Sequence, residues 1–187
     1  MTDSFNQRKS EVLKKIDKSS KGSWDKPIQK LCDKINKQEN YYTTSSCSGR
    51  VLIMIDQEKK AKGLFNWISH KKISFKELKK EIEKLKTNIP IKFKQDPCIL
   101  HVACKSIKDA QALYDKAKRI GWKRSGLISF DKRIILELNS TEKLEFPIMQ
   151  NNKLLINDEF LETIVKDSNK KLERGWKKIK ELRKTIP

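Results

Sequence analysis

The hydrophobic pattern of the chain changes at residues 41–55, which read Tyr41-Tyr42-Thr43-Thr44-Ser45-Ser46-Cys47-Ser48-Gly49-Arg50-Val51-Leu52-Ile53-Met54-Ile55. The β-branched and aromatic residues at 41–44 predict one strand, and the continuous apolar run at 51–55 predicts a second strand, buried on both faces. Between the two strands we expect a polar loop that ends at Arg50. This stretch therefore places a sheet at the centre of the fold.

The spacing of apolar residues on either side predicts the other elements. Helices are expected near residues 4–17, 23–35, 74–86, 106–121 and 157–185. Further strands are expected at 62–69, 90–95, 98–105, 126–130 and 133–138. Ser74 and Glu77 have the spacing of a capping box, Gly121 ends a helix, and residues 150–152 form a polar turn.

These elements predict an α+β fold that forms one domain over residues 1–187. Its parts would be a helical N-terminal part at 1–40, a mixed or antiparallel sheet at 41–147 covered by helices, and a long C-terminal helix at 157–185. No two glycines are two residues apart, so the G-x-G fingerprint is absent and we do not expect a classical Rossmann fold.

The chain is strongly basic, with 43 Lys and Arg against 24 Asp and Glu and a formal net charge of +19. Since this surplus is spread along the chain, it predicts a folded basic surface that binds a polyanion such as a nucleic acid. Of the cations, 36 are Lys and 7 are Arg. Lysine acts as a point charge, which favours contact with the phosphate backbone over readout of base edges. The alternative is a lysine-rich surface that is merely solvated.

Composition also excludes several classes of protein. The longest apolar run, at 51–55, is far shorter than the roughly 20 residues of a membrane helix. The first residues lack the apolar segment of a signal peptide, so we expect a cytoplasmic protein that does not bind a membrane. The four cysteines form no C-x-x-C pair, which predicts free thiols and no metal site. They are Cys32, Cys47, Cys98 and Cys104.

Several common catalytic motifs are absent. The sequence has no Ser-His-Asp order, no G-x-S-x-G, no P-loop and no G-x-G fingerprint. The remaining candidates are the loop at 43–50, whose hydroxyl and N–H groups can hold an anion, and the two histidines, which exchange protons near neutral pH. The alternatives are an ordinary polar turn for the loop and a hydrogen-bonded core residue for His101. His70 follows a strand, where sheets commonly present site residues.

The segment Thr43-Thr44-Ser45-Ser46-Cys47-Ser48-Gly49-Arg50 resembles the hallmark of the archaeal and eukaryotic wybutosine-synthesising tRNA methyltransferases. The resemblance covers nearly the whole chain. It continues in Asp17-Lys18-Ser19 with Lys21-Gly22, Ser69-His70, Ile91-Lys92-Phe93 before Pro97, Ile99-Leu100-His101-Val102, Gly121-Trp122 with Ser125-Gly126, and Asn169 with Lys171. The chain departs from the family pattern at 94–98, which is one residue longer, and at Trp122, which replaces a phenylalanine.

The resemblance implies transfer of a methyl group from S-adenosyl-L-methionine to N-4 of a modified guanine. That base lies 3′ of the anticodon of phenylalanine tRNA, so the implied partner is the anticodon stem-loop. It also implies site residues. As catalytic groups we expect His101, His70 and Ser45, and as residues that bind cofactor or substrate Ser46, Cys47, Ser48, Gly49, Arg50, Lys92, Phe93, Ser125 and Gly126.

Within this set we rank His101 above His70 for a catalytic or substrate-contacting role. We expect Arg50, Lys72, Lys92 and Lys94 to form a basic rim that binds RNA. Two other functions are considered: a non-catalytic RNA-binding protein, and an architectural basic protein without a ligand pocket. Binding of S-adenosylmethionine in the absence of RNA would distinguish the methyltransferase from both.

Overall fold

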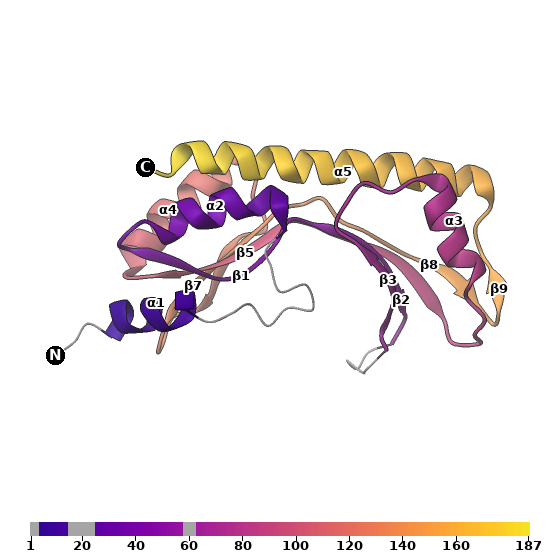
Figure 1. Ribbon diagram of the computed structural model, residues 1–187, viewed down its shortest axis with the longest axis horizontal. Coiled ribbons are helices and arrows are strands. Elements are labelled where there is room, and N and C mark those ends of the chain that lie inside the picture. The colour runs from indigo at the N-terminus through magenta and orange to yellow at the C-terminus, as the bar shows by residue number, and fades with distance from the viewer. Residues whose placement is uncertain (1–3, 15–24, 58–62) are drawn as a thin grey trace. The chain divides into compact units, whose positions relative to one another are not determined.

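The computed structural model describes residues 4–14, 25–57 and 63–187 (Figure 1). The chain folds into two compact units, each assembled from segments that are far apart in the sequence. The first unit contains Met1–Ser48, Cys98–Thr141 and Trp176–Pro187, and the second contains Gly49–Pro97 and Glu142–Gly175. One domain can contain two such units, so the single domain at 1–187 stays a prediction.

The first unit has a four-stranded antiparallel sheet in the order β1-β5-β7-β6. Its strands are β1 (Tyr41–Cys47), β5 (Ile99–Cys104), β7 (Ile134–Asn139) and β6 (Gly126–Ser129). The helices α2 (Lys26–Asn36), α4 (Ile107–Ile120) and the end of α5 (Asp158–Thr185) cover one face. The core there includes Leu31, Leu100, Leu113, Leu136 and Leu182, all at most 1% exposed. The helix α1 (Ser4–Lys14) packs Phe5 and Val12 against the other face.

The second unit has a five-stranded antiparallel sheet in the order β3-β2-β4-β8-β9. Its strands are β3 (Phe65–Ser69), β2 (Arg50–Ile55), β4 (Ile91–Asp96), β8 (Leu144–Gln150) and β9 (Lys153–Leu154). The helix α3 (Phe75–Glu83) also belongs to this unit, with Leu78 and Ile82 buried. Along β4 the side chains alternate between buried Ile91, Phe93 and Gln95 and partly exposed Lys92 and Lys94. Alternation gives this strand one core face and one polar face.

Local sequence signals account for several element ends. Ser74 and Glu77 form a complete capping box at the start of α3. The hydroxyl of Ser106 accepts a hydrogen bond from the N–H of Asp109 and caps α4, which ends at Gly121 with φ +104°. Asn151 and Asn152 have φ of 50° and 56°, as in a tight hairpin turn between β8 and β9.

The predicted α+β class is confirmed. Every strand pair in the described residues is antiparallel, so the fold has no Rossmann-type parallel sheet. The structure divides the expected sheet into two and adds β8 and β9, which the sequence analysis did not predict. Pro147 lies inside β8 and locally disfavours a strand. The ladder between β4 and β8 shifts register between Ile91 and Lys92, opposite Pro147, and such an irregularity tolerates a residue without an N–H. No helix in the described ranges is long and apolar enough to cross a membrane.

The prediction of a polar loop after Thr44 is wrong for most of that segment. Residues 41–47 form one strand, β1, which pairs with β5 and shifts register between Thr43 and Ser45. Only Ser48 and Gly49 lie between β1 and β2, and Gly49 has φ +96°. Serine is a poor strand former, but pairing with a central strand overrides that weak preference. The resemblance at Asp17–Gly22 lies outside the described residues.

Candidate active site

A row of polar side chains crosses one face of the sheet in the first unit. In the antiparallel ladders, Ser45 lies opposite His101, His101 opposite Glu137, and Glu137 opposite Gly126. Directly opposed residues project to the same face, with Cβ atoms about 5 Å apart. Ser45, His101 and Glu137 therefore stand side by side on three neighbouring strands. We call these three residues the polar row.

His101 and Glu137 interact directly. The distance between His101 Nε2 and Glu137 Oε2 is 2.9 Å, and the two side chains are 28% and 24% exposed. Because a carboxylate only accepts hydrogen bonds, this contact places a proton on Nε2, and in the neutral imidazole the lone pair is then on Nδ1. The other oxygen of Glu137 accepts a hydrogen bond of 3.2 Å from Asn139 Nδ2. Glu137 thus orients the imidazole and is itself held in place.

The polar row has an apolar border on one side. Tyr42, Ala103 and Ile135 are buried next to it, and Phe5 of α1 packs on Tyr42 with ring centroids 5.2 Å apart. The other end of the row is open, because a Cβ atom added at Gly126 would meet no heavy atom of the described residues within 4 Å. Ser45 is exposed. The row is therefore accessible from solvent and sheltered along one edge.

The side chains of the serine-rich segment 45–48 do not all project to the same face. Ser45 projects with His101, whereas the hydroxyl of Ser46 interacts with the buried thiol of Cys32 under α2. Cys47 is half-buried and lies opposite Ile99, so it shares the face of the polar row. Ser48 is 1% exposed, and its N–H and hydroxyl both donate to Asp25 Oδ2, at 3.0 and 3.2 Å. Of the four predicted residues, Ser45 is exposed and Cys47 is half-buried, whereas Ser46 and Ser48 make internal contacts.

Ser125 and Gly126 lie at the open end of the polar row. The hydroxyl of Ser125 donates to the Trp122 carbonyl oxygen at 2.7 Å and accepts from the Asn139 N–H at 3.1 Å. These contacts position the strand that carries Glu137 and Asn139. Gly126 lies opposite Glu137 and leaves space beside it.

The remaining predicted site residues belong to the second unit. His70 directly follows β3 and is half-buried. Phe93 is 1% exposed and stacks on Phe146 with ring centroids 5.2 Å apart, so it packs in the core. Asn169 makes two hydrogen bonds with the backbone of Ile73, at 2.9 and 2.8 Å, which hold the connection between β3 and α3.

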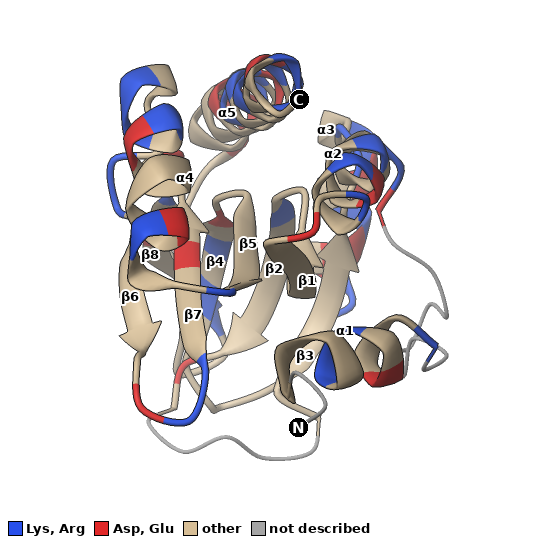
Figure 2. Cartoon of the chain, turned by 90° about the vertical axis from the view of Figure 1, so that its left-hand side faces the viewer, with Lys and Arg blue, Asp and Glu red and all other residues tan. Residues whose placement is uncertain are grey.

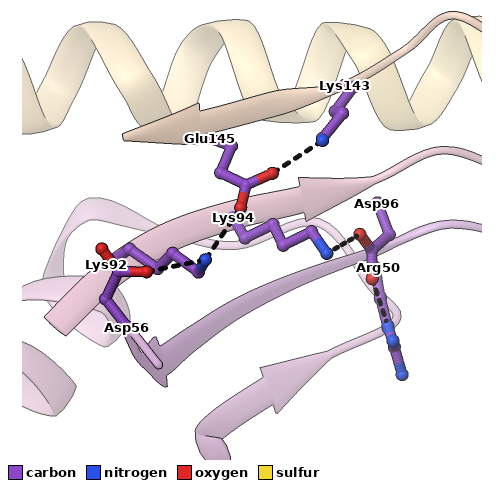
Figure 3. Close-up of polar contacts among 7 residues, drawn as sticks. All are labelled: Arg50, Asp56, Lys92, Lys94, Asp96, Lys143 and Glu145. Atoms are coloured by element: carbon purple, nitrogen blue, oxygen red, sulfur yellow. Dashed lines mark hydrogen bonds and ion pairs between the residues drawn. The ribbon is translucent and has the colours of Figure 1, made fainter. Parts of the chain in front are cut away.

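The cations expected to form a basic rim are engaged in ion pairs, and Figure 3 shows those of Arg50, Lys92 and Lys94. Arg50 Nε and Lys94 Nζ contact the two oxygens of Asp96 at 2.8 and 3.1 Å. Lys92 contacts Asp56 at 2.9 Å and Glu145 at 3.0 Å. Lys72 pairs with Glu173. Each of these cations would have to give up an internal carboxylate to bind a phosphate.

Glu145 has the most perturbed carboxyl group in this network. Hydrogen bonds from Lys143 and Lys92, together with the nearby charge of Lys94, lower the pKa of Glu145 from 4.5 to about 2. The contacts of Lys92 with Asp56 and Glu145 raise the pKa of that lysine. A lowered carboxyl pKa stabilises the fold above the unfolded value of 4.5, and this contribution disappears as the pH falls toward 2.

We therefore expect Glu145→Gln to lower the free energy of unfolding at pH 7 by about 1–2 kcal/mol, after allowance for solvent screening of a side chain that is 30% exposed. The difference from wild type should shrink toward pH 2, as measured by urea unfolding. Glu173→Gln is the matched control, since its pair with Lys72 is about half exposed and contributes little. An equal loss in both variants, or a loss independent of pH, would contradict the network.

Glu137 was not predicted from the sequence. One signal was available. Glu137 is the only charged residue of β7, and it lies between Leu136 and Leu138, which project to the opposite, apolar face. Its contact with His101 depends on the register of β5 against β7, and the two residues are 36 positions apart in the sequence. A single sequence does not show that register.

Comparisons with known proteins agree with this fold. The family described as Methyltransferase TYW3 matches residues 7–187. The tRNA wybutosine-synthesizing protein 3 homolog of Xenopus laevis is 36% identical over 183 residues, which are 95% of this chain and 72% of that protein. A tRNA(Phe) 7-((3-amino-3-carboxypropyl)-4-demethylwyosine(37)-N(4))-methyltransferase 1 of Pyrococcus horikoshii is 34% identical over 191 residues, with 99% and 96% covered.

The same fold has been solved by experiment. The structure of the PH1069 protein from Pyrococcus horikoshii superimposes with a TM-score of 0.89 at 33% identity, and the match covers 97% of this chain and 93% of that one. The predicted resemblance is thus confirmed by sequence and by structure. The chain belongs to the TYW3 methyltransferase family.

Proposed function

We propose that this methyltransferase transfers a methyl group from S-adenosyl-L-methionine to N-4 of the modified guanine 3′ of the anticodon of phenylalanine tRNA. The names of the relatives support this substrate, and the net charge of +19 suits RNA. A tRNA-modifying role also supports action in the cytoplasm. The observation that carries the mechanism is the His101–Glu137 pair on the exposed polar row.

The residues of the row fit such a methyl donor. The donor supplies an electrophilic methyl group on a positively charged sulfur. Glu137 is a partly exposed carboxylate, whose charge suits a cationic ligand, and Ser45 offers a hydroxyl that makes no hydrogen bond within the described part of the chain. The open space at Gly126 leaves room beside the carboxylate.

The chain's main chemical task is to remove one proton. When the substrate nitrogen gains a carbon, it loses the proton of its N–H bond. Nδ1 of His101 takes that proton, because Nε2 already carries one in the contact with Glu137. Glu137 then stabilises the resulting imidazolium. Ser45, next in the row, positions either the substrate or the donor.

Two measurements test the proposed function. Calorimetry should show that the protein binds S-adenosylmethionine without RNA, which a non-catalytic RNA-binding protein would not do. Mass spectrometry should then show one methyl group added to phenylalanine tRNA that carries the unmethylated base. If the protein bound tRNA tightly but neither bound the donor nor methylated the base, the RNA-binding alternative would replace this proposal.

Ser45 and Ser46 form a matched pair of test sites, because they are neighbours on opposite faces of β1. Ser45→Ala should unfold at the wild-type temperature and methylate about tenfold to a hundredfold more slowly, since a contact at the site is lost. Ser46→Ala should methylate at the wild-type rate and lose about 1 kcal/mol of stability or less. Thermal melting and single-turnover kinetics measure both effects. A wild-type rate in Ser45→Ala would remove that residue from the site.

A further inference from the structure

A groove in the first unit has an unusual concentration of positive charge. Its volume is about 500 Å³, and it is formed by α2, the segment that follows it, and the last turn of α5. We call it the basic groove. Its lining residues are Lys30, Asp33, Lys34, Lys37, Gln38, Arg183, Lys184 and Pro187. Figure 2 shows basic positions on α2 and on the C-terminal end of α5.

The lining does not suit a small organic ligand. Pockets for such ligands are mostly apolar, with a few polar groups that fix orientation. The basic groove instead has five basic side chains, one carboxylate and no aromatic or aliphatic side chain apart from Pro187. Flexible lysines without aromatic neighbours are suited to a polyanion backbone, which they bind through charge and without sequence readout.

The cations of the groove also differ from the cations of the expected rim, because most of them have no carboxylate partner among the described residues. Lys30, Lys34, Lys37 and Arg183 make no ion pair within the described residues, and only Lys184 has a carboxylate partner, Glu181, at 2.8 Å. A phosphate can therefore bind four of the five without breaking an internal ion pair. Arg50, Lys72 and Lys94 would each have to break one, and Lys92 would have to break two.

The groove adjoins the strand that carries Ser45. Gln38, which lines the groove, connects α2 to β1, the strand at the edge of its sheet. The ammonium group of Lys9 in α1 donates to the carbonyl oxygen of Gln38, and α1 packs on the face that bears the polar row. A long polyanion can thus follow the β1 edge from the helical face toward the polar row.

Part of this charge has a structural explanation. Lys34 lies in the last turn of α2, and Arg183 and Lys184 lie in the last turn of α5. Cations at these positions interact favourably with the negative end of the helix dipole. That effect stabilises a helix by a fraction of a kcal/mol per residue and requires no ligand. It predicts a change in stability on mutation, and no change in RNA binding. The two roles can therefore be separated by measurement.

We propose that the basic groove binds the phosphodiester backbone of the substrate tRNA, at nucleotides other than the one that is methylated. This inference rests on the proposed function, because it takes tRNA as the substrate. The groove would supply affinity and orientation, while the polar row supplies the chemistry.

The test compares two variants with the same change of charge. Lys30→Gln, Lys34→Gln and Lys37→Gln are combined in the groove variant. The control combines Lys108→Gln, Lys116→Gln and Lys123→Gln, which lie on or just after α4, outside the groove, and have no ion pair within the described residues. Binding to unmodified phenylalanine tRNA is measured by fluorescence anisotropy at several salt concentrations, and stability by thermal melting.

The groove variant should bind tRNA at least tenfold more weakly than the control. The slope of log affinity against log salt should fall by about two to three, which is roughly one unit for each lost phosphate contact. Under saturating tRNA, its methylation rate should equal that of wild type, whereas the KM for tRNA rises. Arg183→Gln should change binding in the same direction.

Equal binding and equal salt slopes in the two variants would overturn the inference. So would a loss of stability in the groove variant without a loss of tRNA affinity, which is the result expected from the helix dipole alone. The binding measurement needs no catalysis, so it stands apart from the proposed function. A wild-type protein that binds tRNA through the groove but does not methylate it would disprove only the proposed function.

Discussion

Replacing His101 with alanine is expected to lower the single-turnover rate of methyl transfer by about a hundredfold to ten-thousandfold, the usual contribution of general base catalysis. The affinity for S-adenosylmethionine should change by less than tenfold, because the imidazole acts on the substrate proton. The side chain is 28% exposed, so we expect the variant to fold. Rapid-quench kinetics with saturating tRNA and donor would measure the rate.

The control for this prediction is His70→Ala. His70 belongs to the second unit and follows β3, and its loss should mainly raise the KM for tRNA. If His101→Ala fails to fold in thermal melting, His101→Gln replaces it, because the amide can still bond to Glu137. An active, folded His101 variant beside an inactive His70→Ala would reverse the ranking of the two histidines.

Replacing Glu137 with glutamine is expected to produce the second largest loss, about tenfold to a hundredfold in kcat with little change in KM for tRNA. The amide keeps the shape of the side chain but removes the charge that orients His101 and stabilises its protonated form. Glu137→Asp should recover part of the rate, because it restores the charge. Single-turnover kinetics of both variants measure this difference.

Asp115→Asn is the matched control for Glu137→Gln. It removes one negative charge from the same unit, at an exposed position on α4 whose carboxylate accepts a hydrogen bond from Gln111. Its rate should equal that of wild type. If Glu137→Gln and Glu137→Asp are equally slow, or if both are as fast as Asp115→Asn, Glu137 does not assist His101 through its charge.

The sequence predicted the elements whose pattern is local. The capping box at Ser74, the glycine stop at Gly121 and the turn at 150–152 are formed by residues close together in the chain. The strand status of Ser45 and Ser46 was not predicted, because serine favours turns and only the pairing with β5 fixes their conformation. β8 was missed for a similar reason. Pro147 locally disfavours a strand, but the irregular pairing of β8 with β4 tolerates a proline at this position.

The candidate site shows the same limit. His101 and Ser45 were selected from motifs, but their proximity to each other and to Glu137 is a consequence of strand register across three strands. The net charge was evident from composition, whereas the pairing of individual cations was not. Arg50 and its partner Asp96 are 46 residues apart, so the sequence did not indicate which lysines and arginines are engaged internally.

The proposed methylation of the modified guanine of phenylalanine tRNA depends on the His101–Glu137 pair. Mass spectrometry of phenylalanine tRNA from a strain that lacks the gene measures this methylation in the cell. We expect the N-4 methyl group to be missing and its precursor to accumulate, with methylation restored by the wild-type gene but not by the His101→Ala gene. A fully methylated base in the deletion strain, or full restoration by His101→Ala, would contradict the claim.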